Sequence, residues 1–173
     1  VDDDESDGDQ SYRIVLGADN GTTDSGYRGL DPLDVVLTNV DDESAGFTMT
    51  INSYTSEKGD ISTIKIKLNS QPTDNVSIGV LSTDESEGKI TNISTGGTSN
   101  VIFTKENWNS YKSIVITGQN DNLSDGDQSY KIELTADNST NDFRYKGRDP
   151  SDVELINSDD DTPGFFISAV SNN

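Results

Sequence analysis

Apolar and polar side chains alternate in several short segments of the chain. In segment 64–68, isoleucine and leucine alternate with lysine; in segment 130–134, tyrosine, isoleucine and leucine alternate with lysine and glutamate. A period of two places one face on a core and the other in water, as in β-strands. Strands bounded by Gly, Asn, Asp, Ser and Pro are therefore expected near 10–17, 35–39, 47–52, 61–68, 76–82, 88–93, 99–103, 113–118, 128–136, 153–157 and 165–170.

The spacing of these segments indicates the fold class. Seven or eight short strands follow one another between residues 47 and 157, with one short helical turn expected at 105–109. Evenly spaced short strands separated by turn residues predict an all-β protein built as an antiparallel, immunoglobulin-like β-sandwich. Phe103, Trp108 and Tyr111 are expected to pack at one edge of its core.

Residues 1–55 and 119–173 are two copies of one segment, aligned without a gap at a distance of 118 positions. Ser6–Tyr12 returns unchanged as Ser124–Tyr130, and about half of all aligned positions are identical. Such self-similarity marks an array of structural units. The expected organisation is about one and a half units, with residues 1–45 the C-terminal part of one repeat, 46–161 a complete repeat and 162–173 the first strand of another.

Two or three strands bury too little surface to be stable alone, so residues 1–45 are expected to need further strands. These can belong to a longer array in the same polypeptide or to a neighbouring molecule that adds a strand and so builds a fibre. The trailing strand alone does not complete a unit, which favours the longer array.

The composition limits the metals and the function classes that are to be expected. The 173 residues include 32 acidic and 12 basic side chains, a net charge of −20, and neither His nor Cys. Without imidazole or thiolate, the metals to be expected are hard cations bound through oxygen. The negative charge argues against nucleic acid and anionic membranes, and no apolar run is long enough to span a bilayer. An enzyme is the least expected class, because without His or Cys only unsupported Ser–Lys pairs offer a nucleophile and its base, and the carboxylates recur in clusters at turns.

The carboxylates gather in the turns, and the clusters return in both copies. In an antiparallel sandwich, loops separated by an even number of strands emerge at the same end, so several clusters can converge there. Crowded carboxylates repel one another unless a cation lies among them, and calcium accepts 6–8 oxygen ligands in flexible geometry. For any single aspartate, a role in turn formation is an equally good reading.

The order of these motifs resembles the Calx-beta family. The carrying residues are Val115–Asp121, then Asp125–Leu134, then the run Asp159–Asp161, with Glu57 and Gly59 after the first strand. The segments Phe103–Asn109 and Tyr145–Pro150 are similar to the version repeated in tandem in large bacterial surface proteins of the adhesin type.

The resemblance implies a sandwich of about seven strands with calcium at the end that carries the terminal Asp run. The implied metal ligands in the complete repeat are Glu57, Asp84, Asp121, Asp125, Asp127, Asp159, Asp160 and Asp161. The corresponding candidates in the first copy are Asp3, Asp7, Asp9, Asp41 and Asp42. Asn120 and Gln128 stand where the family carries acids, so fewer or weaker calcium sites are expected.

The expected function is that of a structural or adhesive extracellular repeat at the bacterial cell surface. Ca²⁺ at the acidic tips would make the junctions between adjacent copies rigid, in a fibre or a long surface protein. One alternative is a glycan- or protein-binding module in which Trp108, Tyr111, Phe143 and Tyr145 form an aromatic platform. The other is a strand-exchanging subunit of a filament.

Overall fold

The structure is a computed structural model that describes residues 2–52, 54–94, 97, 99–165 and 167. The chain divides into two compact units, Val1–Ser44 (unit 1) and Ala45–Asn173 (unit 2). All regular elements of the described residues are β-strands, and none of these residues belongs to a helix that could cross a membrane.

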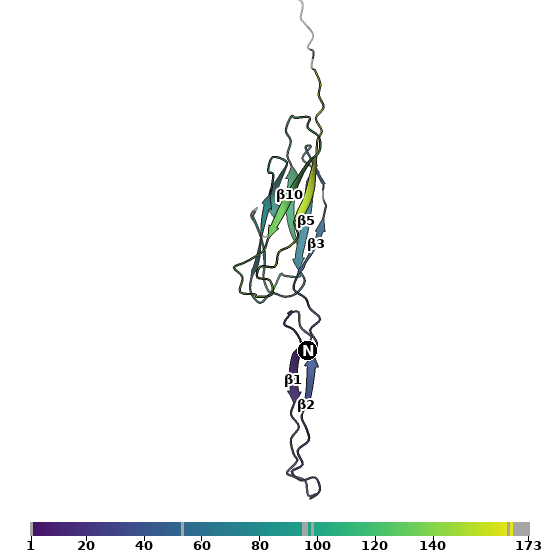
Figure 1. The fold of residues 1–173 in the computed structure, drawn as a ribbon, viewed down its shortest axis with the longest axis vertical. Helices are drawn as coiled ribbons and strands as arrows, with labels where there is room; N and C mark the ends of the chain where they lie inside the picture. Colours follow the sequence, from purple (N-terminus) through teal and green to yellow (C-terminus); the bar gives the residue numbers. More distant parts are fainter. Residues whose placement is uncertain (1, 53, 95–96, 98, 166, 168–173) are drawn as a thin grey trace, which may run out of the picture. The chain divides into compact units, whose positions relative to one another are not determined.

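Unit 2 is a β-sandwich of two sheets whose strands run roughly along one direction (Figure 1). One sheet has the order β4-β11-β10-β6-β8, formed by β4 (Tyr54–Ser56), β11 (Val153–Ser158), β10 (Gln128–Thr135), β6 (Val76–Ser82) and β8 (Asn100–Phe103). The other has the order β3-β5-β9-β7, formed by β3 (Phe47–Ile51), β5 (Ile61–Leu68), β9 (Lys112–Gly118) and β7 (Gly88–Ile93). The all-β sandwich expected from the alternation is thus the fold of unit 2.

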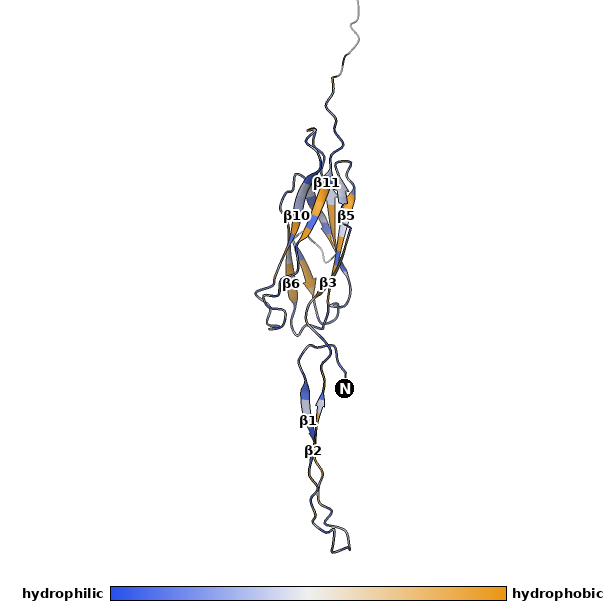
Figure 2. Cartoon of the chain, turned by 45° about the vertical axis from the view of Figure 1, so that its right-hand side comes forward, coloured by the Kyte–Doolittle hydropathy of each residue, from blue (hydrophilic) through white to orange (hydrophobic). Residues whose placement is uncertain are grey.

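The core lies between the two sheets and is supplied by the inward positions of the alternating segments. Ile64, Ile66 and Leu68 of β5 are fully buried, as is Ile132 of β10. Hydropathy follows the same division, with apolar residues on the strands and polar residues in the loops (Figure 2). Each inward side chain removes apolar surface from water, which is the main favourable contribution to folding.

Unit 1 is a two-stranded antiparallel hairpin of β1 (Gln10–Ile14) and β2 (Val35–Asn39). Its register pairs Tyr12 with Leu37. The second copy of the segment pairs Tyr130 with Leu155 between β10 and β11, which is the same register shifted by 118 positions. We call residues 3–43 the first hairpin and residues 121–161 the second hairpin.

Two details differ from the sequence expectation. Strand β4 was not predicted, and it pairs parallel to β11, so the sheet is mixed rather than purely antiparallel. A three-residue strand shows no alternation, and its partner lies about a hundred positions away. Residues 105–109 form hydrogen-bonded turns rather than helix, with the Asn107 amide donating to the Thr104 carbonyl at 3.2 Å.

The expected strand 165–170 lies mostly outside the described residues. Of this segment, the structure describes Phe165 and Ile167, which are exposed and lie outside any strand. Phe47, the counterpart of Phe165, pairs with Leu68 of β5.

The expected aromatic group at the edge of the core forms in part. Phe103 is fully buried and Trp108 packs against the core from a partly buried position. Tyr111 is largely exposed, and the Lys67 ammonium lies 5.5 Å from the centre of its ring.

Candidate metal centre

Three carboxylates from separate segments of unit 2 come together at one end of the sandwich. Glu57 follows β4, Asp121 lies three residues after β9, and Asp161 lies three residues after β11. One carboxylate oxygen of each lies within 4.8 Å of the others. Because β4 and β11 are parallel neighbours, both deliver their following residues to the same end, and the Glu57 amide donates to the Ser158 carbonyl at 3.0 Å.

The chain turns sharply after Glu57. The Gly59 amide donates to the Ser56 carbonyl at 2.9 Å, and Gly59 has a φ of 84°. A side chain is strained at this φ, which explains why glycine occupies the position. The Ser56 hydroxyl donates to Asp60 at 2.6 Å and closes the turn. The turn thereby fixes the position of Glu57 beside Asp121 and Asp161.

Glu57 is an unusual carboxylate because it is buried but incompletely hydrogen-bonded. Its residue is 5% exposed, and its Oε2 atom has no hydrogen-bond partner among the described residues. The Oδ2 atom of Asp161 is in the same condition. A buried carboxylate oxygen without a donor is unfavourable, so each such group needs a reason.

The pKa values of Glu57 and Asp161 are both raised. Burial raises the pKa of Glu57; a hydrogen bond from the Asp160 backbone lowers it, and the charges of Asp121, Asp159 and Asp161 raise it again, leaving it above its ordinary value. Burial also raises the pKa of Asp161, with further upward contributions from Asp160, Asp159 and Asp121. Both carboxylates are therefore in surroundings that disfavour negative charge, which a bound cation would reverse.

Other predicted ligands shape the loop that carries Asp161. Both carboxylate oxygens of Asp159 are engaged, one by the Gly126 amide at 2.8 Å and one by the Asp161 amide at 2.7 Å. Asp127 accepts from the Ser158 hydroxyl at 3.0 Å and from the Asp159 amide at 3.1 Å. These hydrogen bonds hold the terminal Asp run in place, so Asp127 and Asp159 position the group rather than belong to it.

The remaining candidates of unit 2 lie outside the three-carboxylate group. Asp160 is exposed and forms a long ion pair with Lys58 at 3.9 Å, and Asp125 is exposed. Asp84 stabilises its own turn: the hydroxyl and amide of Ser86 donate to it and lower its pKa. Asp84 therefore serves in turn formation, the ordinary role of an aspartate in a loop.

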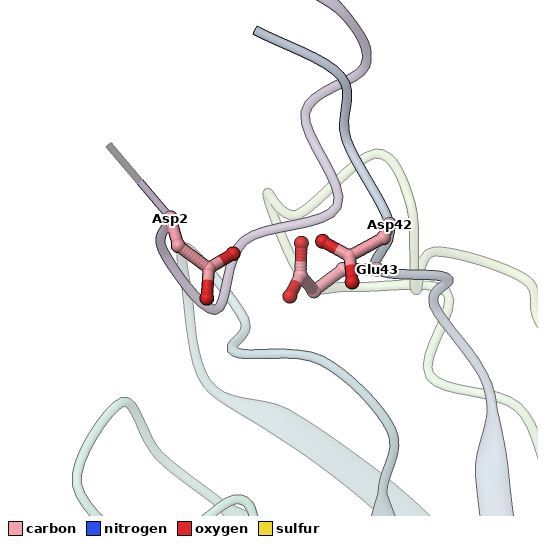
Figure 3. A group of neighbouring side chains, drawn as sticks. All are labelled: Asp2, Asp42 and Glu43. Atoms are coloured by element: carbon pink, nitrogen blue, oxygen red, sulfur yellow. The ribbon is translucent and has the colours of Figure 1, made fainter.

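Unit 1 carries a related but more open cluster. Asp2, Asp42 and Glu43 place one carboxylate oxygen each within 4.8 Å of one another, and Figure 3 shows the three side chains around a common space. Asp2 and Asp42 are exposed. Burial is the largest cause of the raised pKa of Glu43, followed by the charge of Asp42.

Asp9 and Asp41 repeat the loop roles of their counterparts, whereas Asp3 lies outside the unit 1 cluster although its counterpart belongs to the unit 2 group. Asp41 accepts from the amides of Gly8 and Glu43, and Asp9 accepts from the Asp41 amide at 3.0 Å. Asp3 accepts from the Glu5 amide at 2.9 Å, and the carbonyl of Asp7 accepts from the Gln10 amide group at 3.2 Å. None of Asp3, Asp7, Asp9 and Asp41 belongs to the described three-carboxylate group of unit 1.

Two members of the unit 1 cluster, Asp2 and Glu43, are absent from the residues predicted as ligands. A shift of 118 positions places Glu43 on Asp161 and Asp2 on Asn120. Applying the repeat to every member of the acidic runs, rather than to aspartates alone, would have identified Glu43.

Buried carboxylates at the other end of the second hairpin provide a contrast. Asp142 is fully buried and accepts from the Thr73 amide at 2.7 Å, from the Arg144 amide at 2.9 Å and from its side chain at 3.3 Å. Burial alone would raise the pKa of Asp142, but these donors and the Arg144 charge bring it below its ordinary value. Asp137, held by the amides of Ser77, Ser139 and Thr140, has a lowered pKa for the same reason. Asp137 and Asp142 are thus satisfied by donors, whereas Glu57 and Asp161 each keep a buried oxygen without a donor among the described residues.

The proposed aromatic platform does not assemble as expected. Tyr145 is fully buried, and its hydroxyl donates to the Ser70 carbonyl at 2.9 Å and accepts from the Ser70 amide at 3.1 Å. A residue in this position cannot stack on a glycan. Phe143 is exposed, with the Arg144 guanidinium 5.5 Å from its ring centre.

The donor set suits a hard divalent cation. Three carboxylates converge from three strand ends, and two of them keep an oxygen without a hydrogen-bond donor. Calcium takes 6–8 carboxylate, carbonyl and water oxygens in flexible geometry, and the three carboxylates are of the type that it binds.

Comparisons with known proteins return no match. No protein-family model matches the chain, and no curated protein and no solved structure matches it.

Proposed function

We propose that unit 2 binds a calcium ion through Glu57, Asp121 and Asp161, and that the ion has a structural role. The observation that carries the proposal is the buried, unpaired Oε2 atom of Glu57 beside two other carboxylates. A divalent cation at this point supplies the missing partner and offsets both the burial and the smaller repulsion from neighbouring carboxylates that raise the pKa of Glu57. The remaining ligands are water and backbone carbonyls.

The ion ties together three chain segments that are distant in sequence. It links the turn after β4, the loop after β9 and the segment after β11, so the end of the sandwich becomes one rigid piece. Asp161 also lies three residues before Gly164-Phe165, the counterpart of Gly46-Phe47 at the start of unit 2. We therefore place the ion near the junction with a following repeat.

From this chemistry and the sequence resemblance, we propose a Calx-beta-like repeat of a large extracellular protein of the bacterial surface. Its task is mechanical: adjacent copies are held at fixed angles by calcium in a fibre or an adhesin stalk. Neither catalysis nor nucleic-acid binding is part of the proposal.

The test is the thermal stability of the chain with and without calcium. Calcium at a concentration 100-fold above its Kd adds about 2.7 kcal/mol to the stability of the state that binds it. For a domain of this size the melting temperature of unit 2 rises by roughly 10 °C. The single tryptophan, Trp108, packs against the core of unit 2 and provides the fluorescence signal.

Two matched variants separate a specific site from general screening of negative charge. Glu57→Gln removes the buried charge and is expected to abolish most of the calcium response. Glu85→Gln makes the same chemical change at an exposed turn position and is expected to leave the response intact. An equal response in both variants, or a melting temperature that a chelator does not change, contradicts the proposal.

A further inference from the structure

The first hairpin exposes a set of apolar side chains that its second copy buries. Tyr12 is 53% exposed where Tyr130 is 3% exposed, and Leu37 is 37% exposed where Leu155 is fully buried. Ile14 and Val35 are also exposed, and their counterparts in β10 and β11 are buried. All of these belong to the face that points to the core in unit 2.

The difference is not caused by a different hairpin conformation. The strand register is the same in both copies. The Leu16 amide donates to Asp34 at 2.9 Å, and the Leu134 amide donates to Asp152 at 3.0 Å. Gly8 and Gly126 share a φ of 81°. The first hairpin therefore already has the shape that its counterpart has inside a sandwich.

The edges of the first hairpin are also those of an inner pair of strands. In unit 2, β10 pairs with β6 through Ile132 and its neighbours, and β11 pairs with β4 through Ile156 and its neighbours. In the described part of unit 1, β1 and β2 pair with each other and with no third strand. Two neighbouring strands, one antiparallel and one parallel, fit these edges.

Two tyrosines specify what the covering surface must offer. Tyr145 bonds to Ser70, and the Tyr130 hydroxyl lies 3.0 Å from the Thr55 hydroxyl. Ser70 and Thr55 both belong to residues 45–118, which we call the strand body (β3 to β9). Tyr27 and Tyr12, at the equivalent positions of the first hairpin, are exposed.

We propose that the first hairpin is a docking surface for a strand body of the same sequence type as residues 45–118. The occupant supplies equivalents of β6 and β4 at the two edges, an apolar sheet over Tyr12 and Leu37, and hydroxyl partners for the two tyrosines. The second hairpin shows this recognition in the same chain, since the strand body of unit 2 covers it in this way.

A second copy of residues 1–173 does not supply the occupant. These residues hold two hairpins and one strand body, and the second hairpin already occupies that body. Exchange between copies would cover one hairpin by uncovering another, without a net gain of buried surface. The occupant is a further strand body, one for each first hairpin.

The experiment adds that strand body in the register of the repeat. Because residue 1 aligns with residue 119, a second copy of residues 46–118 is fused directly before residue 1, so that the joint repeats the junction 118–119. Hydrogen exchange is measured on the fused chain and on the 173-residue chain. The amides of 10–17 and 35–39 are expected to be slowed by on the order of 10³-fold or more in the fused chain, as for a strand inside a stable domain.

Neighbouring residues on opposite faces provide the control. Leu37→Glu places a charge where Leu155 is buried, and it is expected to remove the new protection. Val36→Glu makes the same kind of change on the outer face, where the second copy already carries Glu154, and it is expected to preserve the protection. The amides of unit 2 in the same molecule report whether the fused chain has folded.

Two results would overturn the proposal. Hairpin amides that stay unprotected in a fused chain with a protected unit 2 overturn the proposal. Protection already present in the 173-residue chain and growing with protein concentration overturns it in favour of self-association. The inference does not depend on calcium, and the measurement is repeated with a chelator so that its result stands apart from that of the metal site.

Discussion

The two hairpins of this protein are one sequence in two surroundings. Both fold to the same register and the same loop hydrogen bonds: the Gly26 amide donates to Asp24 at 2.8 Å, and the Arg144 amide donates to Asp142 at 2.9 Å. The side chains behave differently, because Tyr27 is 69% exposed and Tyr145 is fully buried. Local hydrogen bonds therefore define the conformation, and the strand body determines whether that conformation is buried.

The energetic consequence of this difference is large. Burying one large apolar side chain contributes roughly 1.5–3 kcal/mol. The five inward residues on the strands of the second hairpin therefore contribute roughly 10 kcal/mol; they are Tyr130, Ile132, Leu134, Val153 and Leu155. A small domain has a net stability of about 5–15 kcal/mol. A two-stranded hairpin without cover is marginal in water. The stability of the second hairpin thus comes almost entirely from what covers it.

The largest expected contrast between the hairpins is at their paired leucines. Leu155→Ala removes a fully buried side chain and is expected to destabilise unit 2 by about 2–5 kcal/mol. Leu37→Ala, the identical change in the first hairpin, is expected to stay within about 0.5 kcal/mol. Urea unfolding followed by far-ultraviolet circular dichroism, which reports the strands of both units, measures both, and Trp108 fluorescence identifies the unfolding of unit 2. A loss of several kcal/mol in Leu37→Ala would show that the two hairpins do not differ in cover.

A smaller contrast is expected at the paired tyrosines. Tyr145→Phe removes the hydroxyl that bonds to Ser70 and leaves a buried amide and carbonyl without that partner, which costs about 1–3 kcal/mol. Tyr27→Phe is expected to have no measurable effect, because its hydroxyl is exposed. Differential scanning calorimetry of the two variants checks this, and equal shifts in melting temperature would contradict it.

Much of this architecture is readable from the sequence, because burial on one face imposes a period of two. Segments such as 61–68 and 76–82 were predicted with the bounds that β5 and β6 have. Strand β4 was missed because its three residues are defined by a partner at Ile156–Ser158 rather than by a pattern of their own. Pairing between distant segments leaves no local signal.

The acidic site illustrates the same limit. Glu57, Asp121 and Asp161 were all among the predicted ligands, but so were Asp84, Asp127 and Asp159, whose side chains serve the loops. In the sequence these residues are equivalent members of acidic turns. Asp121 also accepts from a nearby amide, that of Leu123, at 2.6 Å. Only the folded loops show that it lies within 4.8 Å of Glu57 and Asp161, each of which keeps an unpaired oxygen among the described residues. Composition and spacing therefore indicate that the acidic residues gather at one end of the sandwich, and the folded geometry shows which of them lie together.

The smallest expected effect concerns pH, and it separates the two ends of the second hairpin. The pKa values of Glu57 and Asp161 are raised in the folded chain, so without calcium their contribution to stability is present at low pH and is lost as the pH rises through those pKa values. The pKa values of Asp137 and Asp142 are lowered, so their contribution is present at neutral pH and is lost as the pH falls through those values. In chelator, the melting temperature of unit 2 is therefore expected to rise slightly as the pH is lowered from neutral through the raised pKa values of Glu57 and Asp161, and to fall in stronger acid. Glu57→Gln is expected to flatten the rise and leave the acid limb unchanged.

Saturating calcium is expected to invert the rise, because the ion binds the charged carboxylates and is released by protons. A melting temperature that falls steadily below pH 7 in chelator, with the same profile in Glu57→Gln, would mean that the buried glutamate carries no electrostatic strain.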